Sequence, residues 1–340
     1  MTTAAHLVVR TTAVALRRRA EDGLAVFCAP ARPPSHRRDR RAVTVAVAGL
    51  LALLLTVTGC TSGTGAPTAA QTAEGTPNPV SSTTYEGPAR SQPITLTRGD
   101  IRLAGTLEVP ALTAGQKVPL AILMHGLTGS QDEPVVRATT RALLAAGIAS
   151  IRFDFNGHGA SGGEMVDMTV PNEVDDARLF YDYARSLPFV STIGLVGHSQ
   201  GGVVAALLAG QLRGEITALA LLAPATVIPE GARSGNMGGT QFDPANPPEF
   251  INLFGVRIGR EYLRTAQALP INEVPTHYTG PVSLIQGSDD ALIPTSFAED
   301  YIARFQHGEL HMLPGQNHEF SRNLDQPATL VASFMTEHLR

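Results

Sequence analysis

The residues best suited to chemistry lie in the motif G-H-S-Q-G at residues 197–201. A short β-branched, apolar run at 192–196 precedes it and a longer apolar run at 202–209 follows, which predicts a buried strand leading into a helix. Glycines let the backbone pass closely on both sides of Ser199, so its hydroxyl is pushed outward beside the helix N-terminus. The pattern favours a nucleophilic serine over an ordinary glycine-rich turn.

A serine hydroxyl is a weak nucleophile at neutral pH, so it needs an imidazole to accept its proton and a carboxylate to orient that imidazole. Among ten histidines, His318 is distinctive because it lies in a glycine-bearing loop after a predicted strand at 309–313. Asp289 and Asp290 follow another predicted strand at 282–286. Serine, then acid, then histidine is the expected chain order for such a sheet. Spacing alone does not choose between the two aspartates.

Hydrolysis through a tetrahedral intermediate also needs two N–H donors for the developing oxyanion. The backbone N–H of Gln200, directly after the serine, is one candidate. The loop 125–129 follows a predicted strand at 118–124 and offers the N–H of Leu127 as the second. We expect His198 to pack or hydrogen-bond locally.

Strands and helices alternate along the rest of the chain. An extended hairpin is predicted within residues 94–109, and the other predicted strands lie at 118–124, 148–155, 193–197, 216–222, 282–286 and 309–313. The other predicted helices lie at 133–146, 172–187, 296–305 and 327–339. Continuous apolar strands between amphipathic helices predict an α/β fold, with a mainly parallel central sheet covered by helices on both faces.

The alternation stops at residues 224–275, which are rich in Gly, Pro and Asn. An insertion of this length in a compact domain usually has a function. We expect a lid that overhangs the serine, with large side chains walling a substrate pocket; a plain surface excursion is the alternative. The candidate wall residues are Phe242, Phe250, Phe254, Tyr262 and Leu263.

The amino-terminal part differs in composition from the rest. Residues 1–41 hold nine Arg and three acids, and 42–59 form an uncharged apolar run that ends before Cys60. This pattern resembles a bacterial lipoprotein signal, which implies lipidation of Cys60. The alternative is an uncleaved membrane helix. We expect a signal at 1–59, a flexible tether at 60–92 and a catalytic domain at 93–340, lipid-anchored to the membrane outside the cytoplasm or secreted.

Charge and cysteine content exclude several classes of function. Without residues 1–59, Lys+Arg falls from 26 to 17 and Asp+Glu from 30 to 27, so the net charge moves from −4 to −10. This acidic balance argues against nucleic acid as a partner. With Cys28 in the removed part and Cys60 lipidated, no disulfide is expected. No cysteines are grouped and the loop 154–159 lacks a P-loop lysine, so we expect neither a metal nor another cofactor.

Over residues 93–338 the chain resembles the α/β-hydrolase superfamily, and within it the bacterial cinnamoyl (feruloyl) esterases. The stretches that carry the resemblance are 152–159, 196–204, 262–264 and 269–271. The resemblance implies that Ser199, Asp290 and His318 form the catalytic triad, that Leu127 and Gln200 supply the oxyanion donors, and that Tyr262 touches the acyl part of the substrate. Polar lid residues that hold the ferulate hydroxyl in that family fall here on Gly231 and Gly238, which is a departure.

Together these features predict a serine esterase that acts on small carboxylic esters through an acyl-enzyme intermediate. A lipase, thioesterase or peptidase-like hydrolase of the same fold would carry the same three residues. A non-catalytic surface binding module is the other alternative, although such a module has no need of all three. The sequence leaves the acyl preference and the oligomeric state open.

Overall fold

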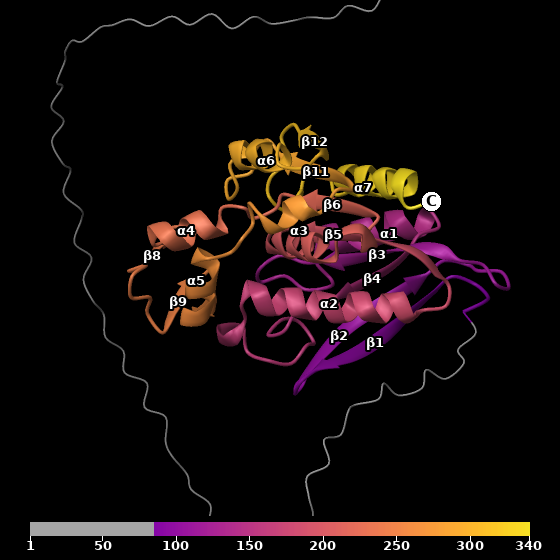
Figure 1. Ribbon diagram of the computed structural model, residues 1–340, viewed down its shortest axis with the longest axis horizontal. Coiled ribbons are helices and arrows are strands. Elements are labelled where there is room, and N and C mark those ends of the chain that lie inside the picture. Colours follow the sequence, from indigo (N-terminus) through magenta and orange to yellow (C-terminus); the bar gives the residue numbers. More distant parts are fainter. Residues whose placement is uncertain (1–84) are drawn as a thin grey trace, which may run out of the picture. The chain divides into compact units, whose positions relative to one another are not determined.

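The computed structural model describes residues 85–340, which contain a central eight-stranded sheet in the order β1-β2-β4-β3-β5-β6-β11-β12 (Figure 1). The strands are β1 (Arg90–Arg98), β2 (Ile101–Val109), β3 (Val118–Met124), β4 (Ala149–Phe153), β5 (Val190–His198), β6 (Ala218–Leu222), β11 (Pro281–Gly287) and β12 (His307–Leu313). The β1–β2 and β2–β4 pairs are antiparallel, and the other neighbouring pairs are parallel. The expected mainly parallel sheet is therefore confirmed.

Helices cover both faces of the sheet. Helices α1 (Pro134–Ala145) and α7 (Asp325–His338) pack on one face, while α2 (Val170–Ser186), α3 (Gln200–Leu212) and α6 (Thr295–Ile302) pack on the other. Side chains of β3 alternate between the two cores: Leu120 and Ile122 face α2 and α3, whereas Ala121 and Leu123 face α1 and α7. Burial on both sides explains why the parallel strands are continuously apolar.

The N-terminus of α2 is fixed by a capping box. The Thr169 side chain accepts a hydrogen bond from the Asn172 N–H at 3.2 Å, and the Asn172 side chain accepts one from the Thr169 N–H at 2.9 Å. Pro171 occupies the first turn, where its missing N–H costs nothing. This cap sets the start of the helix and thereby the place of Glu173, one residue further on.

The insertion between β6 and β11 is built from short elements whose residues show no clear periodicity. They are α4 (Ile228–Ser234), β7 (Asn236–Met237), β8 (Thr240–Gln241), β9 (Phe250–Leu253), β10 (Val256–Gly259), α5 (Arg260–Gln267) and the 3-10 turn η3 (Val274–His277). Two further 3-10 turns, η1 (Met165–Asp167) and η2 (Arg213–Glu215), follow β4 and α3. The α4, α5 and β8–β9 segments lie together at one end of the domain, on the left in Figure 1.

The folded part begins earlier than the expected boundary at residue 93. Strand β1 starts at Arg90, and Tyr85 is buried with its ring 4.6 Å from that of Phe189. The last residues of the expected tether therefore pack on the domain. The expected signal, the rest of the tether and the lipidation of Cys60 lie outside the described residues and stay predictions.

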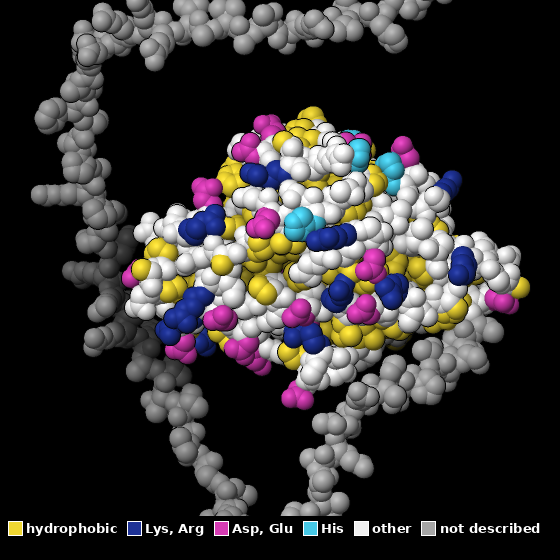
Figure 2. Space-filling model, viewed as in Figure 1, with side chains coloured by type: hydrophobic (Ala, Val, Ile, Leu, Met, Phe, Trp, Pro, Cys, Tyr) yellow, Lys and Arg dark blue, Asp and Glu magenta, His cyan; other side chains and the backbone are white. Residues whose placement is uncertain are grey.

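Acidic and basic side chains are interspersed on the face of the domain seen in Figure 2, with hydrophobic side chains visible between them. Within residues 85–340, no helix has the length and apolarity needed to span a membrane.

Gly201 packs closely against the backbone of β3 and the loop after it, so a substitution there tests the fold. A Cβ at this position would overlap the carbonyl oxygens of Met124 and His125, so Gly201→Ala should lower the free energy of unfolding by about 1–3 kcal/mol in urea titrations. Gly214→Ala is the matched control, because nothing lies within 4 Å of the added methyl group. Equal stability of the two variants would contradict the close approach.

Candidate active site

Ser199 occupies a sharp turn between β5 and α3, with φ 53° and ψ −120°. Residues other than glycine seldom adopt positive φ, so the surrounding structure must hold this conformation. The Ser199 N–H donates to the carbonyl of Leu222 at 2.9 Å, and the Ser199 carbonyl accepts hydrogen bonds from Gly202 at 3.0 Å and Ala225 at 2.9 Å. The predicted strand-to-helix turn is present, and these bonds fix the direction in which the hydroxyl points.

A continuous hydrogen-bonded chain joins Ser199, His318 and Asp290. The Nε2 atom of His318 lies 2.9 Å from the Ser199 hydroxyl, and its Nδ1 lies 2.8 Å from Asp290 Oδ2. Asp290 comes from the loop after β11 and His318 from the loop after β12, so both approach from the edge of the sheet where β5 ends. If Nδ1 carries the hydrogen given to the carboxylate, Nε2 is free to accept the serine proton.

Hydrogen bonds to the Asp290 carboxylate favour its ionised form. Its side chain is fully buried, and it accepts hydrogen bonds from the N–H groups of Leu292 at 2.9 Å and Ile293 at 2.8 Å as well as from Gln286 at 2.7 Å. Burial alone would raise the pKa of Asp290, but the bonds from His318 and the two backbone amides outweigh it and lower that pKa. An ionised carboxylate can orient the imidazole and stabilise its protonated form.

The other aspartate left open by the sequence points elsewhere. Asp289 forms an ion pair with Arg322 at 2.8 Å, with both side chains about half exposed, and its Oδ1 accepts a hydrogen bond from the Ser288 hydroxyl. The choice between Asp289 and Asp290 is therefore made by tertiary contacts that the spacing of the two residues does not encode.

The two expected oxyanion donors lie at the same pocket as the serine hydroxyl. Leu127, Ser199 and Gln200 all line it. Gln200 begins α3, and the first N–H groups of a helix have no intrahelical acceptor. The Leu127 N–H forms no hydrogen bond within residues 85–340. Both amides are thus available to a negatively charged oxygen.

Both polar atoms of the Gln200 side-chain amide are hydrogen-bonded to buried residues, which sequence reasoning missed. Its Nε2 donates to Glu173 Oε2 at 2.8 Å, and its Oε1 accepts from the Tyr262 hydroxyl at 2.7 Å. Burial raises the pKa of Glu173 well above its ordinary value despite the bond from Gln200, and it also raises the pKa of Tyr262. Tyr262, one of the expected wall residues, lines the pocket, but its hydroxyl is hydrogen-bonded to Gln200.

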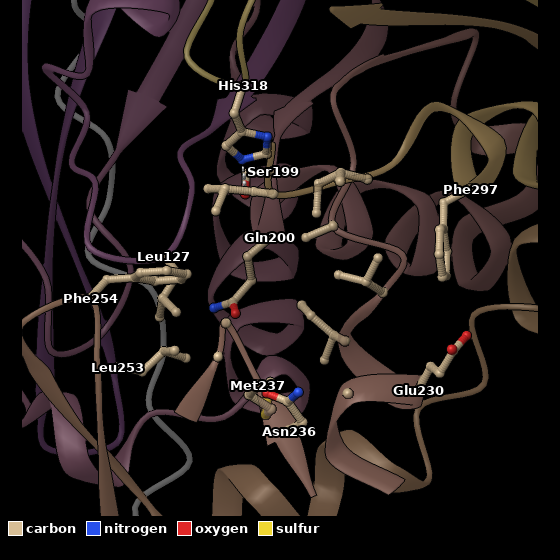
Figure 3. A pocket seen from close by; sticks show the side chains of 18 of the residues that line it. Leu127, Ser199, Gln200, Glu230, Asn236, Met237, Leu253, Phe254, Phe297 and His318 are labelled. Atoms are coloured by element: carbon tan, nitrogen blue, oxygen red, sulfur yellow. Dashed lines mark hydrogen bonds between the residues drawn. The ribbon is translucent and has the colours of Figure 1, made fainter. Parts of the chain in front are cut away.

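The pocket beside Ser199 has a volume of about 380 Å³ and is walled largely by the insertion. Figure 3 shows Leu127, Leu253 and Phe254 on one side, Phe297 on the other, and Asn236 and Glu230 at the end away from the serine. Of the other expected wall residues, Phe242, Phe250 and Leu263 do not line it.

The two glycines that depart from the family pattern are packing positions. Gly238 has φ +53°, and a Cβ there would overlap the ring of Phe254 and the side chain of Leu253. A Cβ at Gly231 would lie 3.0 Å from the Asn236 carbonyl oxygen. Longer polar side chains at these two positions would require the pocket wall to shift.

The spacing of His307 and His311 would put two imidazoles on one face of a helix, but both residues lie on strand β12. Residues four apart on a strand are separated by about 13 Å, which is too far for one metal ion. Within residues 85–340, no cluster of three or more His, Cys, Asp or Glu side chains could hold a metal.

Comparison with known proteins shows which families and enzymes this chain is similar to. The model of the family described as serine aminopeptidase S33 matches residues 116–240. A curated monoacylglycerol lipase from Mycolicibacterium smegmatis is 25% identical over 228 residues, which cover 57% of this chain and 80% of the lipase.

Solved structures extend the match over most of the described residues. The structure of Est1E from Butyrivibrio proteoclasticus with bound ferulic acid is 33% identical, with a TM-score of 0.70, and the match covers 72% of this chain and 98% of that one. Mouse alpha/beta hydrolase domain-containing protein 10 shares the fold at 19% identity and a TM-score of 0.56, over 72% of this chain and 97% of its own. The chain therefore belongs to the α/β-hydrolase superfamily and, within it, resembles the feruloyl esterases.

Proposed function

We propose that the protein is a serine esterase that cleaves small carboxylic esters through an acyl-enzyme intermediate. The observation that carries this proposal is the 2.9 Å contact between His318 Nε2 and the Ser199 hydroxyl, with Asp290 on the other ring nitrogen. A serine held in this way in the wall of a pocket is poised for general-base activation.

Acylation begins when His318 takes the Ser199 proton and the serine oxygen attacks the ester carbonyl. The carbonyl electron pair moves to the oxygen, which the N–H groups of Leu127 and Gln200 stabilise. The electron pair then re-forms the carbonyl, the ester C–O bond breaks, and the alcohol leaves with the proton from His318. Ser199 now carries the acyl group.

Deacylation repeats these steps with water as the nucleophile. His318 accepts a proton from water, the hydroxide oxygen attacks the acyl carbonyl, and the same two amides hold the oxyanion. Collapse of this intermediate breaks the bond to the Ser199 oxygen, which regains its proton from His318, and the carboxylic acid is released. Asp290 stays ionised and stabilises the imidazolium during both halves.

The lining of the pocket favours an acyl group that is apolar next to the serine. Leu127, Leu253 and Phe254 present apolar surface next to the serine, whereas Glu230 and Asn236 at the far end are exposed to water. Est1E with bound ferulic acid and the monoacylglycerol lipase both support an ester as the substrate. Lipases, thioesterases and peptidases could use the same hydrogen-bonded chain. They differ from the proposed esterase only in the acyl length and leaving group of their substrates.

Ser199→Ala tests the nucleophile. Removal of the hydroxyl should lower kcat for p-nitrophenyl butyrate by at least about 10⁴-fold, because no other group can form the acyl-enzyme. The variant should keep the circular-dichroism spectrum and thermal unfolding of the wild type. A folded Ser199→Ala variant with unchanged turnover would remove the serine from the mechanism.

Asp290→Asn and Asp289→Asn form a matched pair. The first change removes the charge that orients His318 and should lower kcat by about 10⁴-fold, as expected when the imidazole adopts the wrong tautomer. The second breaks only the exposed ion pair with Arg322. Because exposed ion pairs contribute little to stability, kcat should stay within about twofold. Equal effects of the two variants would contradict the assignment of Asp290.

Methyl cinnamate and methyl ferulate test the acyl pocket, because they share a leaving group and differ only in ring substituents. A ring hydroxyl of the substrate near the water-exposed Glu230 and Asn236 exchanges a hydrogen bond with water for one with the protein, so its net contribution to binding is small. We therefore expect kcat/KM values within about fivefold of each other, whereas a buried site for the hydroxyl would reject the analogue that lacks it by about 10⁴-fold or more. A strong preference for methyl ferulate would overturn this account of the pocket.

A further inference from the structure

A second hydrogen-bonded chain lies behind the first, centred on His198. The His198 side chain is 2% exposed, and its Nδ1 is 2.8 Å from Glu133 Oε1 while its Nε2 is 3.0 Å from the backbone carbonyl oxygen of His318. Neither a carboxylate oxygen nor a carbonyl oxygen can donate a hydrogen. Both contacts are therefore satisfied only if both ring nitrogens carry one, which makes His198 an imidazolium cation.

The charges around His198 favour this state. Burial alone would lower the pKa of His198, but the carboxylate of Glu133, the His318 carbonyl and the nearby charge of Glu319 outweigh it and raise that pKa. The pKa of Glu133 is lowered to about 2: burial opposes this shift, and the charge of His198 is the main cause of it. A proton shared in the opposite sense, with Glu133 neutral, is thereby disfavoured.

The other imidazoles near His198 do not compete for this charge. His125, in the loop after β3, donates from Nδ1 to the Gly126 carbonyl at 2.8 Å and accepts the Phe155 N–H on Nε2 at 3.1 Å, a pattern that requires the neutral ring. Burial lowers the pKa of His125. The ring of His318 lies 5.1 Å away between centroids, and its Nδ1 is already paired with Asp290.

The Glu133–His198 pair connects three separate segments of the site. Glu133 Oε2 accepts a hydrogen bond at 3.1 Å from the N–H of Gly126, which precedes the oxyanion candidate Leu127. His198 itself precedes Ser199, and its Nε2 holds the backbone of His318. One buried ion pair thus fixes the oxyanion loop, the serine turn and the histidine loop relative to one another.

We propose that His198 is a positioning residue that is held as a cation at neutral pH by Glu133, and that loss of its proton breaks one of its two contacts and sets an upper pH limit on catalysis. The consequence for catalysis rests on the proposed esterase function. A neutral His198 has only one N–H, so it must give up either the His318 carbonyl or the Glu133 carboxylate. The reacting atoms would then shift, and misplacement of about 1 Å can cost 10²-fold in rate.

The same pair predicts a pH window of stability. Because the folded pKa of His198 is raised, its contribution is complete below the unfolded value of 6.5 and is lost as pH rises through the raised value. Because the folded pKa of Glu133 is lowered, its contribution is present above 4.5 and is lost as pH falls toward about 2. The ion pair stabilises the fold fully only between these limits.

Nitrogen-15 NMR of the imidazole rings tests the charge without reference to catalysis. In wild-type protein at pH 7, the His198 resonances, identified by their loss in His198→Gln, should show hydrogens on both nitrogens. The inactive Ser199→Ala variant should give the same result. A neutral His198 ring at pH 7 would overturn the proposal whatever the esterase assays show.

Glu133→Gln tests the role of the pair in catalysis. The change keeps an acceptor for Nδ1, removes the charge and replaces the acceptor of the Gly126 N–H by an amide NH2 group. Loss of the Gly126 hydrogen bond does not depend on pH, whereas loss of the charge should move the upper limit of the pH–kcat profile down by about one unit or more. At pH 8, kcat for p-nitrophenyl butyrate should fall by about tenfold or more while KM stays within about twofold, because positioning rather than binding is lost. A merely structural role would lower activity equally at all pH values.

The exposed pair Glu309–His311 on β12, with 3.0 Å between His311 Nε2 and Glu309 Oε1, supplies the matched control. Glu309→Gln should leave both kcat and the pH profile unchanged. A Glu133→Gln profile that superimposes on that of wild type would overturn the proposal, as would the same shift in Glu309→Gln. Failure of the proposed esterase function is a different outcome, since it would appear as a fully active Ser199→Ala variant.

Discussion

The hydrogen bond between His318 Nε2 and the Ser199 hydroxyl is the interaction on which the rest of the site depends. It joins residues 119 positions apart in the chain, so it forms only when β5 and β12 end at the same edge of the sheet. The strained turn at Ser199 directs the hydroxyl, and Asp290 sets the tautomer of the ring. Each surrounding feature can be understood as a means of holding two atoms 2.9 Å apart.

Two buried polar systems support this contact from different sides. Glu173, Gln200 and Tyr262 connect α2, the start of α3 and the insertion, so the helix that carries the nucleophile is tied to the pocket wall. Glu133 and His198 connect the loops that bracket the serine. Buried polar groups are costly unless every partner is present, and for that reason such systems specify one arrangement of the loops.

The central sheet could be predicted from the sequence because its strands are buried on both faces. Strand β3 lies at the predicted residues 118–124, and the other parallel strands and their helices lie within a few residues of their expected places. The insertion could not be predicted, since its elements are too short to show a period. Helix α5 spans only Arg260–Gln267, and its buried Tyr262 and Leu263 make sense only against α4 and the serine turn.

Part of the site could also be predicted from the sequence, and part could not. Ser199, Asp290 and His318 follow predicted strands, so topology places them together, whereas the choice between Asp289 and Asp290 depends on Arg322, a contact made only in the folded chain. Glu133 and His198 carry no spacing signal, although an acid at the start of the helix after a glycine loop is a hint toward a nearby N–H. The sequence predicted that His198 would pack or hydrogen-bond locally, and its hydrogen bond to the loop of His318 was missed.

The central claim is that Ser199 is activated by His318, and covalent labelling tests it most directly. Intact-mass analysis after treatment with a fluorophosphonate should show one adduct per chain, and peptide mapping should place it on Ser199. A folded protein that stays unlabelled, or that carries the label on another residue, would contradict the account.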